Sequence, residues 1–347
     1  MYESNTGTVT DALAQANANV FNQATIDRIL ALTASTPSDT SVTITEAIAT
    51  NGQVAVPTGT ELLFLTSNET VQTSLVAPAN TPVVVLQGAG GFNLNFQNAP
   101  VTPTADYKPL VDRVVVHSQG ADKIVIEDGK NTQVTIGAGD TVIGGAGYDT
   151  VIAGAGDSTV IGGSGFTTVQ LGGSASDYTV TYVDGRAVVS NSVTGVTTEL
   201  SNVQFIQLDN GEALVLAKDS LEAAVSFLYE TTFNRSADGV GLDFWFDRAR
   251  EGVSLSDIAN AFTTATEFQN LASVSNEAFI QGAFQNTFNR GASTVELLQW
   301  TAALEGGSSR GDLLEYLVDT AAQYLDGTLQ SEVTLTGTIT IVPGIIG

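Results

Sequence analysis

Side chains with oxygen ligands recur at a nine-residue spacing in the middle of the chain. From His117 to Gln170 the sequence divides without gaps into six blocks of nine residues. The sixth position of successive blocks holds Asp122, Asn131, Asp140, Asp149, Ser158 and Thr167. Calcium takes roughly six to eight oxygen ligands, drawn from carboxylates, amides and backbone carbonyls. The spacing therefore predicts a row of sites for a hard divalent cation, and Asp157, displaced by one position, is a further candidate ligand.

Glycines precede these ligands in most blocks. Because glycine has no Cβ, it adopts turn conformations in which backbone carbonyl groups face a cation. The glycines that we expect to contribute to the sites are Gly120, Gly137, Gly139, Gly145, Gly147, Gly154 and Gly156. The last three positions of each block form a minimal strand, whose eighth residue is apolar and branched in five of the six blocks. Stacked strands of this kind predict a thin β core.

One block, from Gly144 to Ile152, satisfies every fixed position of the pattern G-G-x-G-x-D-x-U-x. The six blocks together resemble the calcium-binding nonapeptide repeats of the RTX family. That resemblance implies a parallel β-roll in which two nonapeptides make one coil. Each block would then stack on the block two places later.

The same resemblance implies how the ligands are shared. Asp122 and Asp140 would form one calcium site, and Asn131 and Asp149 would form another on the opposite side of the roll. A third site would use Asp140 together with Asp157. The expected cofactor is therefore Ca²⁺.

Some positions depart from the pattern. Ser158 and Thr167 replace the carboxylate in the last two blocks, and Gln133 occupies an inward position in the second. We therefore expect a roll that becomes less regular towards its C-terminal end. The alternative is a metal-free β-solenoid in which the glycines serve only the turns. A thin core would then hold aligned carboxylates without neutralising charge, which counts against this alternative.

The charge balance excludes some classes of function. Twelve Lys and Arg residues face 37 Asp and Glu residues, which gives a formal net charge of −25. Nucleic-acid binding needs a basic surface and is excluded, whereas divalent cations suit such a chain. Acidity that serves only solubility or a saline habitat is the alternative. The chain has no cysteine, and its single histidine, His117, is interpreted as a turn residue at the edge of the roll.

Residues needed for common catalytic sites are missing. A zinc metalloprotease needs two histidines at helical spacing, and the sequence also lacks a G-x-S-x-G elbow, a P-loop and a cysteine nucleophile. Carboxylates alone could serve a glycosidase, so that chemistry stays open by residue type. We predict that the chain is not an enzyme.

Composition divides the chain into five segments. Residues 1–41 have a weak helical pattern, 42–116 are β-rich, 117–216 hold the repeats and capping strands, 219–326 are helical, and 327–347 form a β-type tail. We predict a multidomain α+β protein, with a β-rich N-terminal half that includes a parallel β-roll, followed by an all-α domain. No stretch has the roughly 18 apolar residues of a membrane helix, and no cleaved N-terminal secretion signal is recognisable.

The helical segment contains a second repeat, at an offset of 55 residues. The tripeptide at 233–235 recurs at 288–290, and Trp245 aligns with Trp300. The first copy resembles the DUF4214 family, which is common in large RTX-bearing exported and surface-layer proteins. We expect the two tryptophans to anchor the core, and Asp238 to cap a helix rather than bind calcium.

Together these features predict a calcium-dependent extracellular structural protein that self-assembles, as a subunit of a surface layer, sheath, filament or biofilm matrix. The RTX resemblance implies type I secretion with an uncleaved C-terminal signal. The tail from Glu332 to Gly347 is compatible with that signal, or with a strand donated to a neighbouring subunit. The expected partner is a second copy of the chain, with cell-surface polysaccharide as a further candidate. The alternatives are a calcium-stabilised adhesin for a glycan or host surface, and an enzyme whose catalytic part is residues 42–116.

Overall fold

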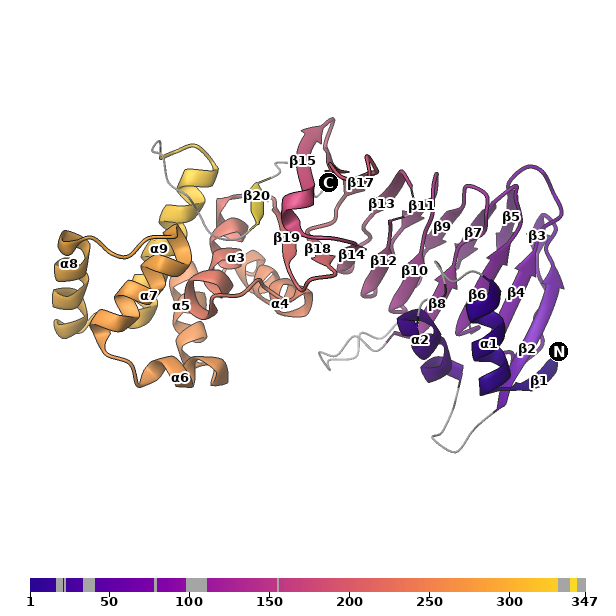
Figure 1. Cartoon of the computed structure of the whole chain (residues 1–347), viewed down its shortest axis with the longest axis horizontal. Helices are drawn as coiled ribbons and strands as arrows, with labels where there is room; N and C mark the ends of the chain where they lie inside the picture. The colour runs from indigo at the N-terminus through magenta and orange to yellow at the C-terminus, as the bar shows by residue number, and fades with distance from the viewer. Residues whose placement is uncertain are drawn as a thin grey trace. The chain divides into compact units, whose positions relative to one another are not determined.

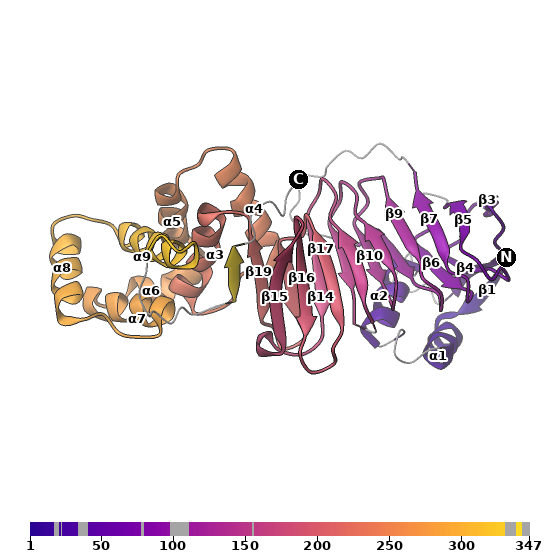
Figure 2. The ribbon, with the colours of Figure 1, turned by 90° about the horizontal axis from the view of Figure 1, so that it is seen from above.

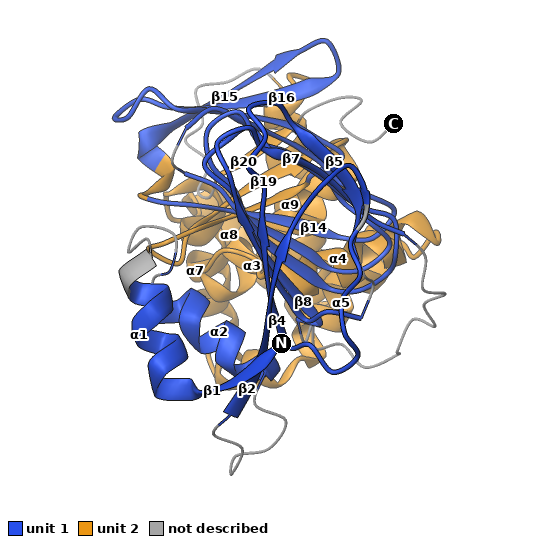
Figure 3. Cartoon of the chain, turned by 90° about the vertical axis from the view of Figure 1, so that its right-hand side faces the viewer, with its two compact units in different colours: residues 1–172, 176–203 blue, residues 173–175, 204–347 orange. Residues whose placement is uncertain are grey.

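The structure is a computed structural model of the chain, and it describes residues 1–16, 21, 23–33, 41–77, 80–97, 111–154, 156–329 and 338–341. The chain forms two compact units (Figure 3). Unit 1 comprises residues 1–172 and 176–203, and unit 2 comprises residues 173–175 and 204–347. Unit 1 is rich in parallel strands and unit 2 is mainly helical, which confirms the coarse division predicted from composition.

Unit 1 contains two sheets, and from β2 to β14 consecutive strands of the chain alternate between them (Figures 1 and 2). The unit 1 strands of the first sheet, in spatial order, are β1 (Tyr2–Asn5), β2 (Ser41–Ile48), β4 (Leu62–Thr66), β6 (Val83–Gln87), β8 (Arg113–Val116), β10 (Thr132–Thr135), β12 (Asp149–Ile152) and β14 (Thr167–Leu171). Those of the second sheet are β3 (Gly52–Gln53), β5 (Thr73–Val76), β7 (Phe92–Phe96), β9 (Lys123–Ile126), β11 (Thr141–Ile143), β13 (Ser158–Ile161), β17 (Thr197–Ser201), β16 (Arg186–Asn191) and β15 (Tyr178–Val183).

Most neighbouring strands of unit 1 are parallel. The exceptions among the described strands are β1 on β2, and β16 with its two neighbours β15 and β17. The antiparallel strands β15–β17 follow the last repeat block and extend the second sheet beyond β13 through a parallel β13–β17 pair. They occupy the place in the sequence where capping strands were predicted.

The strand register follows the sequence repeat. Val142 in β11 lies opposite Val160 in β13, and Val151 in β12 lies opposite Val169 in β14. Each pair is 18 residues apart, the length of two blocks. None of the four valines has exposed surface, so the eighth position of these blocks fills the interior.

The second block departs from this register. Val134, not Gln133, lies opposite Val151, and Val134 has no exposed surface. The prediction that Gln133 takes the inward position of the row is therefore wrong. A shift of one residue turns each side chain of a strand to the other face, so an apolar side chain replaces the amide in the stacked row.

Two helices cover one face of the first sheet. They are α1 (Thr6–Ala16) and α2 (Gln23–Thr33), and they form one buried cluster with strands β2, β4, β6 and β8. The members of the cluster are Val9, Leu13, Phe21, Ile26, Ile29, Val42, Ile44, Leu62, Val83, Val85, Val114 and Val116. Successive side chains of a strand point to opposite faces, so continuous apolar runs such as Val83–Leu86 are buried on both sides. The N-terminal segment, in which the sequence shows only a weak helical pattern, therefore forms the two helices that cover this sheet.

Unit 2 combines short strands with helices. β18 (Phe205–Leu208) pairs antiparallel with β19 (Ala213–Ala217), and β20 (Ile339–Ile341) pairs parallel with β19. The helices of eight or more residues are α3 (Ser220–Phe233), α4 (Gly239–Arg250), α5 (Leu255–Thr264), α7 (Asn276–Phe288), α8 (Thr294–Glu305) and α9 (Arg310–Leu325). A short α6 (Gln269–Ala272) lies between α5 and α7. The predicted secretion signal falls largely on residues 330–337 and 342–347, which lie outside the described residues.

The helices repeat at the same 55-residue offset as the sequence. The bounds of α4 and α8 differ by 55 residues at both ends. Asn234 ends α3 and Asn289 ends α7, both in the left-handed conformation, and Ser254 and Ser309 cap the N-termini of α5 and α9. The sequence duplication is therefore a duplication of structure, and Asp238 caps the N-terminus of α4 by accepting the N–H of Gly241.

Candidate metal centre

Asp122 and Asp140 are neighbours in the structure. Each lies in the turn before its strand, β9 or β11, and the N–H of Asp122 donates to Oδ1 of Asp140 at 2.7 Å. Both residues are only 1% exposed. Oδ2 of Asp140 accepts the N–H of Gly137 at 2.6 Å, while Asp122 accepts the N–H groups of Ser118 and Phe92. The two predicted partners of the first site are thus brought together and held by backbone amides of successive turns.

His117 completes a cluster with these carboxylates. Its Nδ1 lies 3.6 Å from Oδ2 of Asp140, and one ligand atom each from His117, Asp122 and Asp140 lies within 4.8 Å of the others. Sequence reasoning treated His117 only as a turn residue. The stacking of blocks two places apart was the signal that could have placed it beside the turn at Gly137, since His117 N–H donates to the carbonyl of Thr135.

Asp149 occupies the corresponding position of the first sheet, as the first residue of β12. Its Oδ2 accepts the N–H of Gly145 at 2.7 Å and its Oδ1 accepts the N–H of Thr132 at 3.3 Å. The Oδ1 of Asn131 accepts the N–H of Tyr148, the residue before Asp149. The structure therefore brings Asn131 to the same turn as Asp149, while Thr132 supplies the contact to the Asp149 carboxylate.

A buried ion pair that sequence reasoning missed lies near Asp149. Nη2 of Arg113 is 2.6 Å from Oδ2 of Asp128, and neither side chain has exposed surface. The guanidinium carbon also lies 3.9 Å from the centre of the Phe96 ring. The positive charge of Arg113 lowers the pKa of Asp149, whereas the charge of Asp128 raises it. The Arg113 side chain thus places a fixed positive charge near Asp149.

Burial dominates the titration of the aspartates in these turns. It raises the pKa of Asp122 to about 6 and that of Asp149 to about 7, against an ordinary value of 3.8. It also raises the pKa of Asp140. Hydrogen bonds from backbone amides act in the opposite direction but do not cancel the desolvation. The turns therefore hold carboxylates whose charge is only partly compensated.

These residues fit a hard cation by their chemistry. A carboxylate offers about four acceptor positions, and the hydrogen bonds described above use two on Asp140 and two on Asp149. Oxygen lone pairs therefore remain for a metal ion. A divalent cation would also offset the desolvation that raises the pKa values of these groups.

Asp157 lies in an open groove of about 270 Å³. The lining residues are Gly139, Asp140, Asp157, Ser158, Thr159, Thr197 and Glu199. Oδ1 of Asp157 accepts the N–H of Thr197 at 2.8 Å, and the Asp157 carbonyl accepts the N–H of Gly139. The structure thus brings the predicted third pair, Asp140 and Asp157, to one groove. It adds Glu199, a carboxylate that lies outside the repeat and that sequence reasoning therefore missed.

The glycines predicted to supply carbonyl oxygens lie in the turns and connections that precede the strands of the repeat. They are Gly120, Gly137, Gly139, Gly145, Gly147, Gly154 and Gly156. At Gly145 a Cβ would lie 2.2 Å from the carbonyl oxygen of Asp128, and Gly139 has a φ of 83°. Close stacking and turn conformation thus require glycine at these two positions with or without a metal ion.

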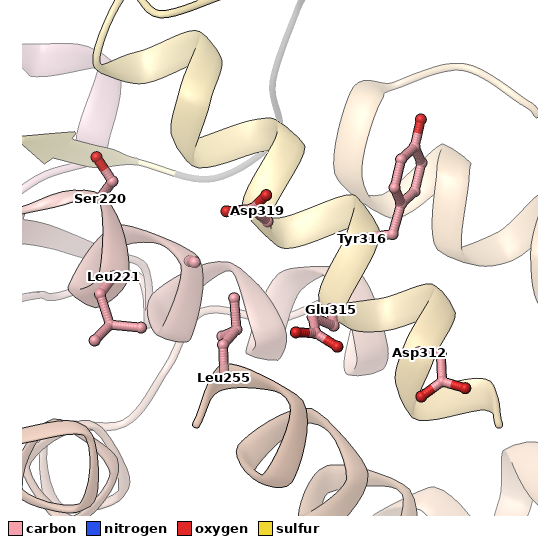
Figure 4. A pocket seen from close by; sticks show the side chains of 8 residues that line it. Ser220, Leu221, Leu255, Asp312, Glu315, Tyr316 and Asp319 are labelled. Carbon is pink, nitrogen blue, oxygen red and sulfur yellow. The ribbon is translucent and has the colours of Figure 1, made fainter. Parts of the chain in front are cut away.

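A second groove lies within unit 2 and has a volume of about 490 Å³ (Figure 4). Its lining residues are Ser220, Leu221, Ala224, Leu255, Asp312, Glu315, Tyr316 and Asp319. Figure 4 shows the three carboxylates on α9, with Leu221 on α3 and Leu255 at the start of α5. The groove combines apolar surface with negative charge.

Residues 216–272 match the family described as Domain of unknown function (DUF4214). The match includes α3–α5 and confirms the resemblance of the first helical copy. No match to a curated protein or to a solved structure was found. Among the described residues, no helix has the length and apolar character needed to cross a membrane.

Proposed function

We propose that the chain is a calcium-dependent extracellular structural protein that self-assembles, and that the repeats of unit 1 wind as an RTX-type β-roll. The observation that carries the proposal is the burial of Asp122, Asp140 and Asp149 at the N-terminal ends of stacked strands, where burial raises their pKa values. A bound divalent cation would stabilise the ionised carboxylates, so its binding energy would add to the stability of the fold.

Calcium is best supported at the turns of the second sheet. Asp122 with Asp140 offers one pair of buried carboxylates, and Asp140 with Asp157 and Glu199 offers an open groove. Backbone carbonyls of the turn glycines would complete the coordination. Asp149 lies near the positive charge of Arg113, so a calcium ion gains less there.

Binding outside the cell follows from the affinity expected for such sites. Extracellular calcium modules have dissociation constants of about 10⁻⁴–10⁻³ M. The metal would then bind only after export, for which we propose type I secretion. The net charge of −25 and the lack of cysteine suit an exported calcium protein, and the DUF4214 match agrees with the family's occurrence in surface-layer proteins. The partner would be a second copy of the chain, with cell-surface polysaccharide as a further candidate.

Thermal unfolding with and without calcium tests the metal-binding part of this proposal. For those dissociation constants, 10 mM calcium stabilises each occupied site by roughly 1.4–2.7 kcal/mol. The melting temperature of unit 1, followed by far-UV circular dichroism, should rise in calcium and fall in EGTA. Asp184→Asn, in an exposed turn outside the repeat, is the matched control and should respond like the wild type.

The double variant Asp122→Asn/Asp140→Asn should lose most of the calcium response. It keeps the shape of both side chains but removes their charge. A melting temperature that does not change between EGTA and 10 mM calcium would refute calcium dependence. An equal response in the double variant and the wild type would place the calcium elsewhere.

The groove in unit 2 favours a second candidate function, a calcium-stabilised adhesin. Tyr316, which is 48% exposed, is one of the lining residues of this groove, which also include carboxylates and the hydroxyl-bearing Ser220. An exposed aromatic ring with hydrogen-bonding neighbours is a surface on which a glycan could bind. Glycan-array binding that is lost in Tyr316→Ala would favour the adhesin over the structural protein.

A further inference from the structure

The single histidine of the chain lies against two buried carboxylates. His117 contacts the turn that contains Asp140, and Asp140 in turn accepts a hydrogen bond from Asp122. The imidazole side chain is 14% exposed, so the cluster is accessible to a small ion from one side. Imidazole is a poor ligand for calcium but a common ligand for zinc and related transition-metal ions.

The distances in the cluster suit an ion with short bonds. Zinc binds histidine nitrogen and carboxylate oxygen at about 2.0–2.2 Å, so two ligands of a tetrahedral zinc ion lie roughly 3.4 Å apart. Nδ1 of His117 and Oδ2 of Asp140 are 3.6 Å apart, and one ligand atom each from His117, Asp122 and Asp140 lies within 4.8 Å of the others. Three ligand atoms are therefore close enough to bind one ion after a small adjustment.

Gly137 makes room for the imidazole. A Cβ at this position would lie 2.5 Å from Cε1 and 2.8 Å from Nδ1 of His117. Any larger residue would therefore displace the ring from the carboxylates. Glycine at position 137 therefore allows the ring to pack beside the carboxylates. This packing is a separate observation from the nine-residue spacing that predicts calcium sites.

Backbone amides orient both carboxylates. Oδ2 of Asp122 accepts the N–H of Ser118 at 2.6 Å, and Oδ2 of Asp140 accepts the N–H of Gly137 at 2.6 Å. Outer hydrogen bonds of this kind hold metal ligands in place. We propose that His117, Asp122 and Asp140 form a site for a transition-metal ion of the zinc class. This proposal goes beyond calcium binding and does not depend on it.

One histidine in 347 residues makes a direct test possible in the unmodified protein. The imidazole signals of the full chain are recorded by NMR during separate titrations with Zn²⁺ and with Ca²⁺. The site predicts a zinc-bound imidazole signal that saturates at one equivalent and persists in 10 mM calcium. Co²⁺ should give visible d–d absorption bands that zinc abolishes. Unchanged imidazole signals at saturating zinc would overturn the proposal.

Variants separate this site from general binding of zinc to an acidic surface. His117→Asn should weaken zinc binding by at least about 100-fold, because outer-shell partners alone contribute about 10–100-fold. Gly137→Ala keeps every ligand but displaces the imidazole, and it should weaken binding as well. Asp184→Asn removes a carboxylate from an exposed turn outside the repeat and should leave zinc affinity unchanged.

Equal zinc affinity in the wild type and His117→Asn would show that the imidazole is not a ligand. The calcium response of the melting temperature should survive in His117→Asn, because imidazole does not bind calcium. Failure of the zinc site and failure of the calcium proposal are therefore distinguishable.

Discussion

Two buried charges, Arg113 and Asp128, are oriented by hydrogen bonds and by an aromatic ring. The guanidinium donates to both oxygens of Asp128, at 3.2 Å and 2.6 Å, and lies over Phe96. Removing one partner of a buried pair leaves the other charge without compensation, which costs about 3–5 kcal/mol. The cost is not symmetric here, because Arg113 also interacts with Asp149.

Arg113→Met should therefore destabilise unit 1 more than Asp128→Asn does. The first change leaves Asp128 and Asp149 as two buried carboxylates, and we expect a loss of about 3–5 kcal/mol in the free energy of unfolding. The second leaves Arg113 beside Asp149, so the loss should be smaller. Arg113→Met/Asp128→Leu should recover part of the stability. Urea unfolding followed by far-UV circular dichroism measures each loss, and equal losses in the two single variants would contradict this account.

The raised pKa values of Asp122 and Asp149 predict a specific dependence of stability on pH. Their folded-state values, about 6 and about 7, lie above the ordinary 3.8, so between pH 4 and 7 the folded state binds more protons than the unfolded state. The free energy of unfolding should therefore fall as pH rises through this range and level off above it. In EGTA, the melting temperature of unit 1 should be lower at pH 7.5 than at pH 5.

Asp149→Asn should flatten this slope, because an amide does not titrate, whereas Asp184→Asn should leave it unchanged. The titration of Glu296 does not contribute to the change in melting temperature between pH 5 and pH 7.5. Hydrogen bonding to Arg290 lowers the pKa of Glu296 to about 2, so its contribution to stability is lost only below the ordinary value of 4.5. A melting temperature that rises from pH 5 to 7.5 would contradict the assignment, as would equal slopes in the wild type and Asp149→Asn.

The strands show which parts of the fold follow from sequence. The 18-residue offset between Val142 and Val160 follows directly from the nine-residue spacing. The shift that places Val134, rather than Gln133, opposite Val151 does not follow from it, because both registers keep the same turn residues. Long-range contacts accompany the observed register: Arg113 in β8 pairs with Asp128, which lies just before β10, and no local pattern reveals that pair.

The candidate metal site, like the strand register, could be predicted from the sequence only in part. Asp122 and Asp140 come together because the repeat spacing places them in successive turns of one sheet. His117 is the first residue of the first block, a position whose residue type varies from block to block, so block stacking predicts where it lies but not that it is a ligand. Glu199 lies outside the repeat, so its proximity to Asp140 depends on how the capping strands pack. The helical cover of the first sheet was also missed, since an apolar run shows that both faces are buried but not which element buries them.

The helices of the duplicated segment differ in how much of their apolar surface is buried. Leu317 on α9 has no exposed surface, whereas Leu298 on α8 is 65% exposed and α8 has no buried residue. Leu317→Ala should lower the free energy of unfolding of unit 2 by about 2–5 kcal/mol, because it leaves a cavity. Leu298→Ala should change it by less than about 0.5 kcal/mol.

Tryptophan fluorescence during urea unfolding reports on unit 2 alone, since Trp245 and Trp300 are the two tryptophans of the chain and both lie in that unit. A loss above 1 kcal/mol for Leu298→Ala would show that α8 is covered by a second copy of the chain under the conditions of the measurement. Dilution should then reduce that loss, because coverage by a second copy depends on concentration.

The net charge of −25 opposes self-association of the chain. Each bound calcium ion offsets only two charges, so a few sites leave most of the repulsion in place. Under the proposed function, assembly therefore depends on ordering of unit 1 by calcium, or on calcium held between subunits. Either route makes assembly specific for calcium, and sodium at equal ionic strength should not replace it.

The C-terminal strand β20 allows a prediction of how a truncated chain assembles. β20 pairs with β19 inside the same chain, so a version ending at Gln330 lacks this strand and exposes the edge of β19. An open edge pairs readily with other strands and favours irregular aggregation. Light scattering and negative-stain images should therefore show ordered sheets or filaments for the full chain in calcium, and less ordered aggregates for the truncated version. A full chain that stays monomeric at millimolar calcium and high protein concentration would contradict the structural role and favour the adhesin. Ordered assembly of both versions would show that the subunit contact does not involve β19 or β20.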